Sequence, residues 1–252
     1  PSITSNGKYM FYTYSSPSAN NPTVTKIYVS RRINGTWSIG RELKLAENDN
    51  TSLFAHPSVS PSGEYLYFVS DMLGGYGSKD IWRAKLANEI EPLFIENLGP
   101  EINKPGDEVF PYLRNDTTLY FSSDGHPGMG GLDIFIARKQ NNSEQWNIEN
   151  IKSPITSSYD DFGITFKKNS EKGFFSSNRN DTRGYDHIYS FEIPNNIITV
   201  EGIVVDHEDE FIYGATVLVV GSDGLQQSFK TNKEGEYRFV ANAGNNYLLM
   251  AI

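Results

Sequence analysis

Two pairs of adjacent carboxylates come nearest to a catalytic arrangement in this sequence: Asp107–Glu108 and Asp160–Asp161. Two carboxylates that flank a glycosidic bond can act as general acid and as base or nucleophile in its hydrolysis. The two pairs, however, occupy equivalent points in a repeated segment, whereas a catalytic pair is usually unique in a chain. We therefore interpret both pairs as structural carboxylates.

A second set of polar side chains encloses three short, glycine-rich loops. The enclosing residues are Asp71 and Asp80, Asp124 and Asp133, and Asn178 and Asp186. Carboxylates with glycine turns suit Ca²⁺, but the spacing of an EF-hand loop with its distal Glu is missing. Short Asp and Asn side chains also accept hydrogen bonds from backbone N–H groups in turns. We predict that these six side chains pin the loops and that they bind no metal.

Other catalytic and cofactor motifs are missing from the sequence. There is no cysteine, which excludes disulfides, thiolate nucleophiles and Cys-ligated zinc. No Gly-x-Ser-x-Gly elbow and no phosphate-binding loop is present. The histidines show no ligand spacing and are interpreted as surface or turn residues; they are His56, His126, His187 and His207. We therefore expect no cofactor and predict that the chain is not an enzyme.

The chain contains four copies of one unit with a period in the low fifties. Phe68, Phe121 and Phe175 lie 53 and 54 residues apart. The copies cover residues 1–56, 57–110, 111–162 and 163–193. Such a fixed period is the sequence signature of a repeat architecture.

Each unit contains short segments that favour β-strands, and no segment shows a helical period. In the second unit, for example, residues 66–70 form an aromatic strand and residues 80–86 follow the glycine-rich loop. A fourth strand is expected at residues 36–45, 92–98 and 145–151. Four strands repeated around an axis predict an all-β chain whose first 193 residues form a β-propeller of four visible blades.

The aromatic strands alternate in a way that indicates burial on both faces. Leu66 and Phe68 share one face, whereas Tyr67 and Val69 share the other. Both faces are apolar, as expected for a strand that lies between two neighbouring blades. The alternative is an aromatic platform for glycans.

A second domain is predicted over residues 197–252, after a short linker at residues 194–196. Its period-two alternation and its Gly- and Asn-containing turns predict a small antiparallel β-sandwich. About 56 residues are few for such a domain. Two interpretations stay open: the final strand or strands of the domain are missing from this sequence, or residues 248–252 form its last ordered segment.

The repeats resemble a known family of propellers. The pattern Tyr-Phe-x-Ser-Asp followed by Gly-Gly-x-Asp-Ile is similar to the TolB-type, WD-like repeat. The segments DEVFPY (107–112), YFSSDG (120–125), GGLDIF (130–135) and SSYDDFGI (157–164) resemble repeats of OmpA-family envelope proteins of Bacteroidetes. These include the periplasmic lipoprotein subunit of the type IX secretion apparatus.

The resemblance extends to the second domain. In that family the propeller is followed by a carboxypeptidase-regulatory-like domain and then by a peptidoglycan-binding OmpA-like domain. VEGIVVD (200–206), YGATVLV (213–219) and TNKEGEYRF (231–239) resemble the regulatory-like, transthyretin-like module. This chain departs from the family because it shows no helical-repeat segment, lipobox or OmpA-like domain.

The net charge and the hydropathy of the chain exclude some classes of binding partner. The net charge of −9, from 22 basic and 31 acidic residues, disfavours binding to nucleic acid or to anionic membranes through basic patches. No apolar run is long enough to span a membrane. Because Pro1 is not a natural start, any signal peptide, lipid anchor, further blade or ring-closing strand would lie upstream.

These observations and the resemblance together predict a non-catalytic scaffold of a bacterial envelope complex. It is expected in the periplasm, tethered to the outer membrane through parts outside this chain. Its expected partners are envelope or secretion-system proteins, with peptidoglycan bound through a domain outside the chain. Two alternatives stay open: a glycan- or peptide-binding accessory module of an exported degradative system, and the propeller of a hydrolase whose catalytic domain is missing. Trp82 and Tyr76 are the first residues to test for glycan contact.

Overall fold

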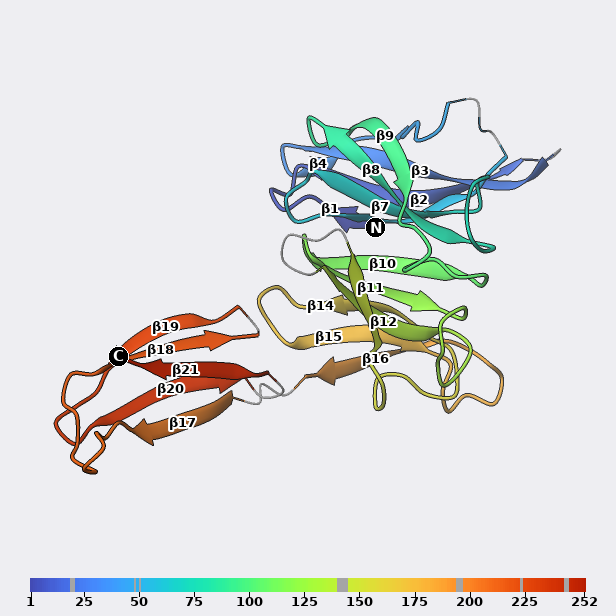
Figure 1. Ribbon diagram of the computed structural model, residues 1–252. Coiled ribbons are helices and arrows are strands. Elements are labelled where there is room, and N and C mark those ends of the chain that lie inside the picture. Colours follow the sequence, from blue (N-terminus) through green and yellow to red (C-terminus); the bar gives the residue numbers. More distant parts are fainter. Residues whose placement is uncertain are drawn as a thin grey trace. The chain divides into compact units, whose positions relative to one another are not determined.

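We describe the fold from a computed structural model, which describes residues 1–18, 21–47, 49, 51–139, 145–193, 197–222, 224–242 and 245–252. The predicted linker at 194–196 lies outside these residues. The chain divides into two compact units, Pro1–Glu192 and Ile193–Ile252. In the described part every regular element is a β-strand (Figure 1), so the predicted all-β class is confirmed. This part holds no helix long and apolar enough to cross a membrane.

The first unit consists of four antiparallel sheets, one for each sequence repeat. The first sheet contains β1 (Ser2–Ile3), β2 (Tyr9–Ser18), β3 (Asn21–Ile33), β4 (Thr36–Trp37) and β5 (Arg41–Glu42). The second contains β6 (Phe54–Val59), β7 (Tyr65–Ser70), β8 (Asp80–Ala87) and β9 (Glu91–Asn97). The third contains β10 (Glu108–Asn115), β11 (Thr118–Ser123), β12 (Asp133–Lys139) and β13 (Trp146–Asn150). The fourth contains β14 (Asp161–Phe166), β15 (Lys172–Ser177) and β16 (His187–Glu192).

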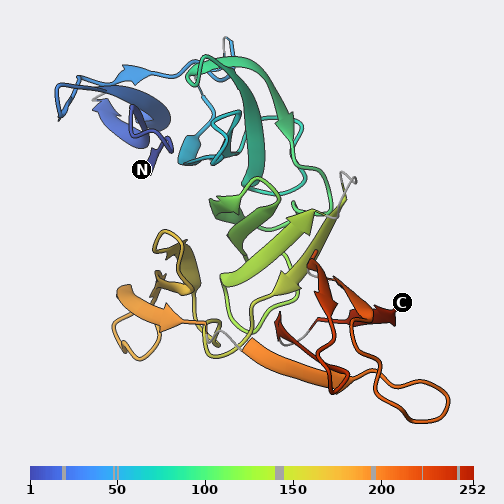
Figure 2. The same cartoon turned by 90° about the vertical axis from the view of Figure 1, so that its left-hand side faces the viewer.

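The four sheets are blades of a β-propeller. Within each sheet the described strands pair with their sequence neighbours, except that β5 pairs with β3, so each repeat folds locally as an antiparallel meander. Figure 2 shows the sheets succeeding one another around an arc, from the blue first sheet to the gold fourth sheet. The strands β1, β6, β10 and β14 are the first of their blades, and together they line one cavity. We call them the inner strands and number the blades 1 to 4.

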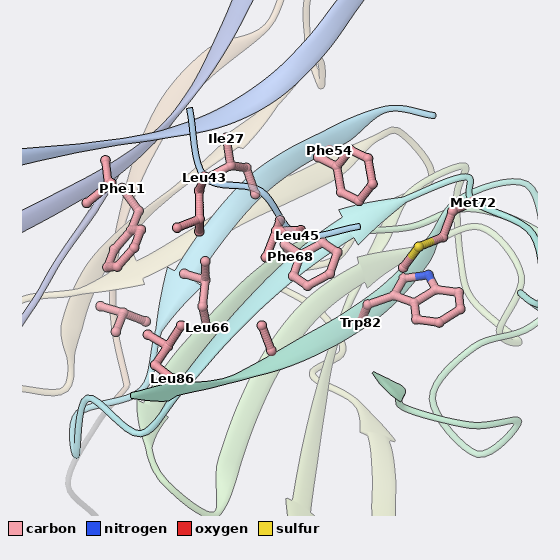
Figure 3. Close-up of a cluster of buried hydrophobic side chains, with 13 residues drawn as sticks. Phe11, Ile27, Leu43, Leu45, Phe54, Leu66, Phe68, Met72, Trp82 and Leu86 are labelled. Carbon is pink, nitrogen blue, oxygen red and sulfur yellow. The ribbon is translucent and has the colours of Figure 1, made fainter. Parts of the chain in front are cut away.

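Three apolar layers hold neighbouring blades together. Leu66 and Phe68 of β7 pack with Phe11 and Ile27 of blade 1, and Figure 3 shows these side chains pointing toward one another. Tyr67 and Val69 on the other face of β7 belong to the layer shared with blade 3. The same alternation builds the layer between blades 3 and 4. The prediction that both faces of the aromatic strands are blade-to-blade core is confirmed.

The burial of equivalent residues depends on whether a neighbouring blade covers them. Tyr120 of β11 and Phe174 of β15 occupy the same register, because their following residues pair with Phe135 and Tyr189. Tyr120 packs against blade 4 and is 4% exposed, whereas Phe174 is 53% exposed. The covering blade, rather than the strand itself, therefore removes this side chain from water.

The second unit contains two small sheets around a separate core. β17 (Ile197–Ile203) pairs with β20 (Glu236–Asn242), while β18 (Thr216–Gly221) lies between β19 (Gln226–Lys230) and β21 (Tyr247–Ala251). Val217 and Val219 of β18 pack against Phe239 and Ala241 of β20. Residues 247–251 form the last described strand.

The first prediction concerns the blade-to-blade core. Phe121 is fully buried, and its ring centroid lies 5.7 Å from that of Phe135. Phe121→Ala is expected to lower the free energy of unfolding by about 3–5 kcal/mol, because a cavity is left between two blades. Phe174→Ala is the matched control and should cost less than about 1 kcal/mol, since its ring is half exposed. Guanidinium denaturation would measure both; equal losses would contradict the proposed role of the covering blade.

Candidate functional site

A cavity of about 1080 Å³ lies among the inner strands of the propeller. All four blades contribute to its lining, through Ile3 of β1, Val59 of β6, Leu113 of β10 and Thr165 of β14. The site is therefore built from the strand that each repeat contributes first.

The inner strands of blades 2, 3 and 4 share a β-bulge. Pairing with the neighbouring strand shifts register at the same place in each blade, between residues 55 and 58, 109 and 112, and 162 and 165. The backbone there is left-handed, with φ of 49° at His56, 53° at Phe110 and 66° at Gly163. A positive φ is uncommon for residues other than glycine. Because a bulge re-aims side chains, all three of these residues reach the cavity lining.

Aromatic rings from three blades stack at the bulges. The rings of His56 and Phe110 are nearly parallel, with centroids 4.0 Å apart and an interplanar angle of 12°. Phe110 also stacks on Phe162, with centroids 5.0 Å apart and an angle of 25°. Phe110 thus meets a ring from each neighbouring blade, and its two faces are covered. We call His56, Phe110 and Phe162 the ring stack.

His56 is held as a neutral, oriented hydrogen-bond donor. The backbone N–H of Phe110 donates to its Nδ1 at 3.3 Å, and its own backbone N–H donates to Thr13 Oγ1 at 3.0 Å. Burial, with a smaller contribution from Lys79, lowers the pKa of His56 to about 4, so the imidazole is neutral at pH 7. Since Nδ1 accepts, the proton lies on Nε2. In the described part of the chain no atom accepts a hydrogen bond from this Nε2–H.

Basic side chains lie at the other end of the cavity, where the inner strands turn back. Lys167 and Lys168 follow β14, are exposed, and form no ion pair within the described ranges. Arg114 of β10 donates to the carbonyl of Ser170 at 3.3 Å and pairs with Glu171, which ties blade 3 to blade 4. None of the described residues that line the cavity is Asp or Glu. In a chain of net charge −9 this makes the cavity an electropositive region.

Three residues predicted to pin loops hold the inner strands instead of the loop tips. The backbone N–H of Leu53 donates to Asp71 at 2.8 Å. The equivalent bonds run from Asp107 to Asp124 at 2.6 Å and from Asp160 to Asn178 at 3.0 Å. Each bond joins the start of an inner strand to the end of its neighbour in the same blade. In blade 4 the acceptor is the side-chain amide oxygen of Asn178 instead of a carboxylate oxygen. This agrees with a position that needs a hydrogen-bond acceptor but no charge.

Asp80 and Asp133 accept hydrogen bonds from their glycine-rich loops. Asp80 is buried and accepts from the backbone N–H groups of Tyr76 at 2.6 Å and Gly77 at 2.9 Å. Asp133 is equally buried and accepts from Met129 and Gly130 at 2.5 and 2.9 Å.

A further partner of Asp80 was missed in the sequence. The side-chain amide of Asn97 donates to Asp80 at 2.7 Å, and Asn150 stands in the same register of blade 3. The dipeptide Glu-Asn recurs 53 residues apart at 96–97 and 149–150. That recurrence is the signal that could have revealed it.

Asp186 does not occupy the position predicted for it. Ser123 pairs with Asp133 across the sheet, but the equivalent Ser177 pairs with His187, so Asp186 lies one residue before the expected register. The strands of blade 4 follow those of blade 3 after 54 residues, from Ser123 to Ser177, whereas Asp133 and Asp186 lie 53 residues apart. A one-residue shift turns a side chain to the other face of a strand. Asp186 is exposed, and its loop is held by Asp181, which accepts from the backbone N–H of Arg183 at 2.8 Å.

Asp181 carries further bonds that stabilise its ionised form. It pairs with the guanidinium of Arg183 at 3.0 Å and with His187 Nε2 at 2.8 Å. These two side chains hold the pKa of Asp181 well below its ordinary value, Arg183 having the larger effect.

The two carboxylate pairs lie outside the cavity lining and are engaged in structural contacts. Glu108 is fully buried and accepts from Ser123 Oγ at 2.6 Å and from the backbone N–H of Lys104 at 2.7 Å. Asp161, at the same position of blade 4, is also buried and pairs with Arg179. Asp107 pairs with Lys79 at 2.5 Å. Burial raises the pKa of Glu108 to about 7.

The remaining histidines serve as local contacts. His126 contacts the carbonyl of Ile102 through Nε2 at 2.7 Å, and burial lowers its pKa. His207 is exposed beside Glu208. Interpreting all four histidines as surface or turn residues was therefore wrong for His56, which lies within β6, whereas the partly exposed His126 does lie in a bend. No group of three side chains suited to hold a metal ion occurs among the residues that the structure describes.

Comparisons with known proteins show that the fold of this chain is similar to that of several solved structures. No protein-family model and no curated protein sequence matches the chain. A solved structure of TolB from Acinetobacter baumannii is 13% identical, with 97% of this chain and 54% of that chain covered and a TM-score of 0.41. An alpha-L-arabinofuranosidase from Lactobacillus brevis is 10% identical, with 82% and 72% covered and a TM-score of 0.48.

A puromycin hydrolase is 12% identical, with 76% of this chain and 26% of that chain covered and a TM-score of 0.46. This chain spans 26% to 32% of the length of that hydrolase and of the prolyl oligopeptidase B from Galerina marginata that it also matches.

These matches correct one prediction. We predicted that the chain is not an enzyme, yet the matched structures include peptidases and glycosidases. The prediction rested on missing sequence motifs, whereas function is decided by the geometry and chemistry of a site. The absence of a motif therefore does not exclude catalysis.

The second prediction tests the loop contacts. Asp133→Ala leaves two backbone N–H groups without their acceptor and is expected to cost about 1–3 kcal/mol. The exposed Asp186→Ala at the neighbouring register is the control and should change stability by less than about 0.5 kcal/mol. Thermal unfolding would measure both, with and without added calcium or EDTA. A calcium-dependent rise in the Tm of the unmodified chain would favour a metal site instead.

The third prediction concerns Glu108 and pH. Its pKa is about 7 in the folded state against an ordinary value of 4.5, so between these pH values the folded state binds more protons than the unfolded state. Stability from this group is therefore present below pH 4.5 and is lost as the pH rises to 7. The stability of Glu108→Gln relative to the unmodified chain should rise over this window by up to about 3 kcal/mol.

Urea denaturation at a series of pH values would measure this difference. Glu91→Gln, at an exposed site of β9, is the control and should show a constant difference. A pH-independent difference for Glu108→Gln would show that burial does not perturb this carboxyl.

Proposed function

We propose that this chain is an interaction module of a bacterial cell-envelope complex and that the propeller cavity is its binding site. The observation that carries the proposal is the convergence on one cavity of about 1080 Å³ of the ring stack and of Lys167 and Lys168, which form no ion pair with any residue that the structure describes. Left-handed backbone at His56 and Phe110 costs free energy, and such strained positions cluster at active and ligand-binding sites.

The envelope setting is supported by the sequence motifs. The segments 107–112 and 157–164 resemble repeats of OmpA-family proteins of Bacteroidetes, and they supply the buried acids Glu108 and Asp161 at the start of β10 and β14. The second unit, with its two packed sheets, would be the carboxypeptidase-regulatory-like domain of that family. On this proposal the protein acts in the periplasm, joined to the outer membrane, to peptidoglycan and to type IX secretion components through parts outside this chain.

A second candidate is a glycan- or peptide-binding accessory module, and its peptide form is favoured by the site. Trp82, which the sequence offered for glycan contact, is buried between blades 1 and 2. Tyr76 is half exposed but does not line the cavity. The face of Phe110, the central ring of the stack, is covered, so stacking of a sugar on it is blocked.

The fourth prediction tests the cavity as the contact surface. A photo-crosslinking amino acid at Asn115, which lines the cavity, should capture an envelope protein in cells of the source organism. The same substitution at Asn147, exposed on β13 and outside the lining, is the control and should capture none. Mass spectrometry would identify the product. Capture of the same protein from both positions, or capture only of cytoplasmic proteins, would contradict the proposal.

A further inference from the structure

We propose that the propeller cavity recognises the carboxylate groups of an acidic, extended peptide segment. This inference rests on the proposed binding role of the cavity and adds the chemical class of its ligand. Three independent features of the lining carry it: its charge, the orientation of its rings and its length.

The charge of the lining is opposite to that of the protein. The chain carries 31 acidic and 22 basic residues, yet no described lining residue is acidic, while Arg114, Lys167 and Lys168 are basic. The arginine is already engaged with Glu171, so the two lysines are the cations left to pair with a ligand. An anion that approaches this acidic protein therefore meets attraction at the cavity and repulsion over much of the remaining surface.

The ring stack presents donors and ring edges. The faces of Phe110 are covered by His56 and Phe162, which leaves the edge of this ring to meet a ligand. The edge of an aromatic ring carries partial positive charge, whereas the face carries partial negative charge. The Nε2–H of His56 adds a neutral donor at the same end. This combination suits a carboxylate oxygen better than a sugar ring or a cation.

The length of the lining suits an extended chain. The cavity follows β10 from Phe110 at the bulge to Asn115 at the turn, a distance of about 17 Å along the strand. A peptide of about five residues in extended form has the same length. Its carboxylates would meet the ring stack at one end and Lys167 and Lys168 at the other. Pro57 and Pro111 lie between these ends and give the walls an apolar surface.

The proposal is tested by isothermal titration calorimetry of the whole chain with three probes of equal length. These are a hexapeptide of alternating Ala and Glu, the same peptide with Gln for Glu and a blocked C-terminus, and hexagalacturonate. The Glu peptide is expected to bind at least tenfold more tightly than the Gln peptide, about the effect of one charge-assisted hydrogen bond. Added salt should weaken its binding, because exposed lysines contribute.

Two double variants with the same change in charge identify the site. Lys167→Gln with Lys168→Gln should weaken binding of the Glu peptide about tenfold or more. Lys230→Gln with Lys233→Gln, at exposed sites of the second unit, should leave it unchanged. All four lysines are exposed, so the variants are expected to fold.

Equal affinity for the Glu and Gln peptides, or equal losses in the two double variants, would overturn the proposal. Tighter binding of hexagalacturonate would assign the carboxylate to a sugar and would overturn the peptide as ligand. If these titrations fail while crosslinking from Asn115 still captures an envelope protein, the ligand class is wrong and the proposed function stands. If crosslinking fails as well, the proposed function is wrong.

Discussion

The site of this protein depends on one backbone constraint, the bulge that blades 2, 3 and 4 place on their inner strands. An extra residue leaves the hydrogen-bond ladder, and the chain passes through a left-handed conformation at His56, Phe110 and Gly163. For the two residues with side chains this costs on the order of 1–3 kcal/mol each. The freed N–H groups find partners in the preceding blade: His56 donates to Thr13, and Phe110 donates to His56. The same bulge thus joins neighbouring blades and brings their rings together.

The bulges can hold this geometry because the blades fit closely against one another. A Cβ on Gly77 would lie 2.2 Å from the carbonyl oxygen of Lys104, and one on Gly130 would lie 2.2 Å from that of Tyr159. Backbone atoms cannot yield to such contacts, so only glycine allows each loop to rest on the next blade. The glycine-rich loops, which suggested a cation site, are therefore docking surfaces between blades. Their aspartates accept hydrogen bonds within the loops.

Much of the propeller could be predicted from sequence because its determinants are local and repeated. Strand alternation, the glycine-rich loops and the period of about 53 residues each appear several times, so a coincidental pattern in one copy does not mislead the prediction. The ring stack could not be predicted in this way, because its rings come from different residue types in three repeats. His56 looked like an isolated turn residue, although it precedes Pro57 as Phe110 precedes Pro111. Asp186 failed for the opposite reason: it lies 53 residues after Asp133, but the paired strands of blade 4 follow those of blade 3 after 54 residues.

This division between repeated and varied residues explains where chemistry can reside in the molecule. Positions that join the strands within a blade recur with little change, as Asp71, Asp124 and Asn178 do, and their side chains are already occupied by hydrogen bonds. The bulge position holds a different residue in each of blades 2, 3 and 4, from His56 to Phe110 to Gly163, while the backbone around it stays the same. A side chain there can change without loss of a blade-to-blade layer, because those layers are built by the aromatic strands. The residues that determine function in this propeller can therefore vary along the inner strands, where the packing of the blades constrains the residue type least.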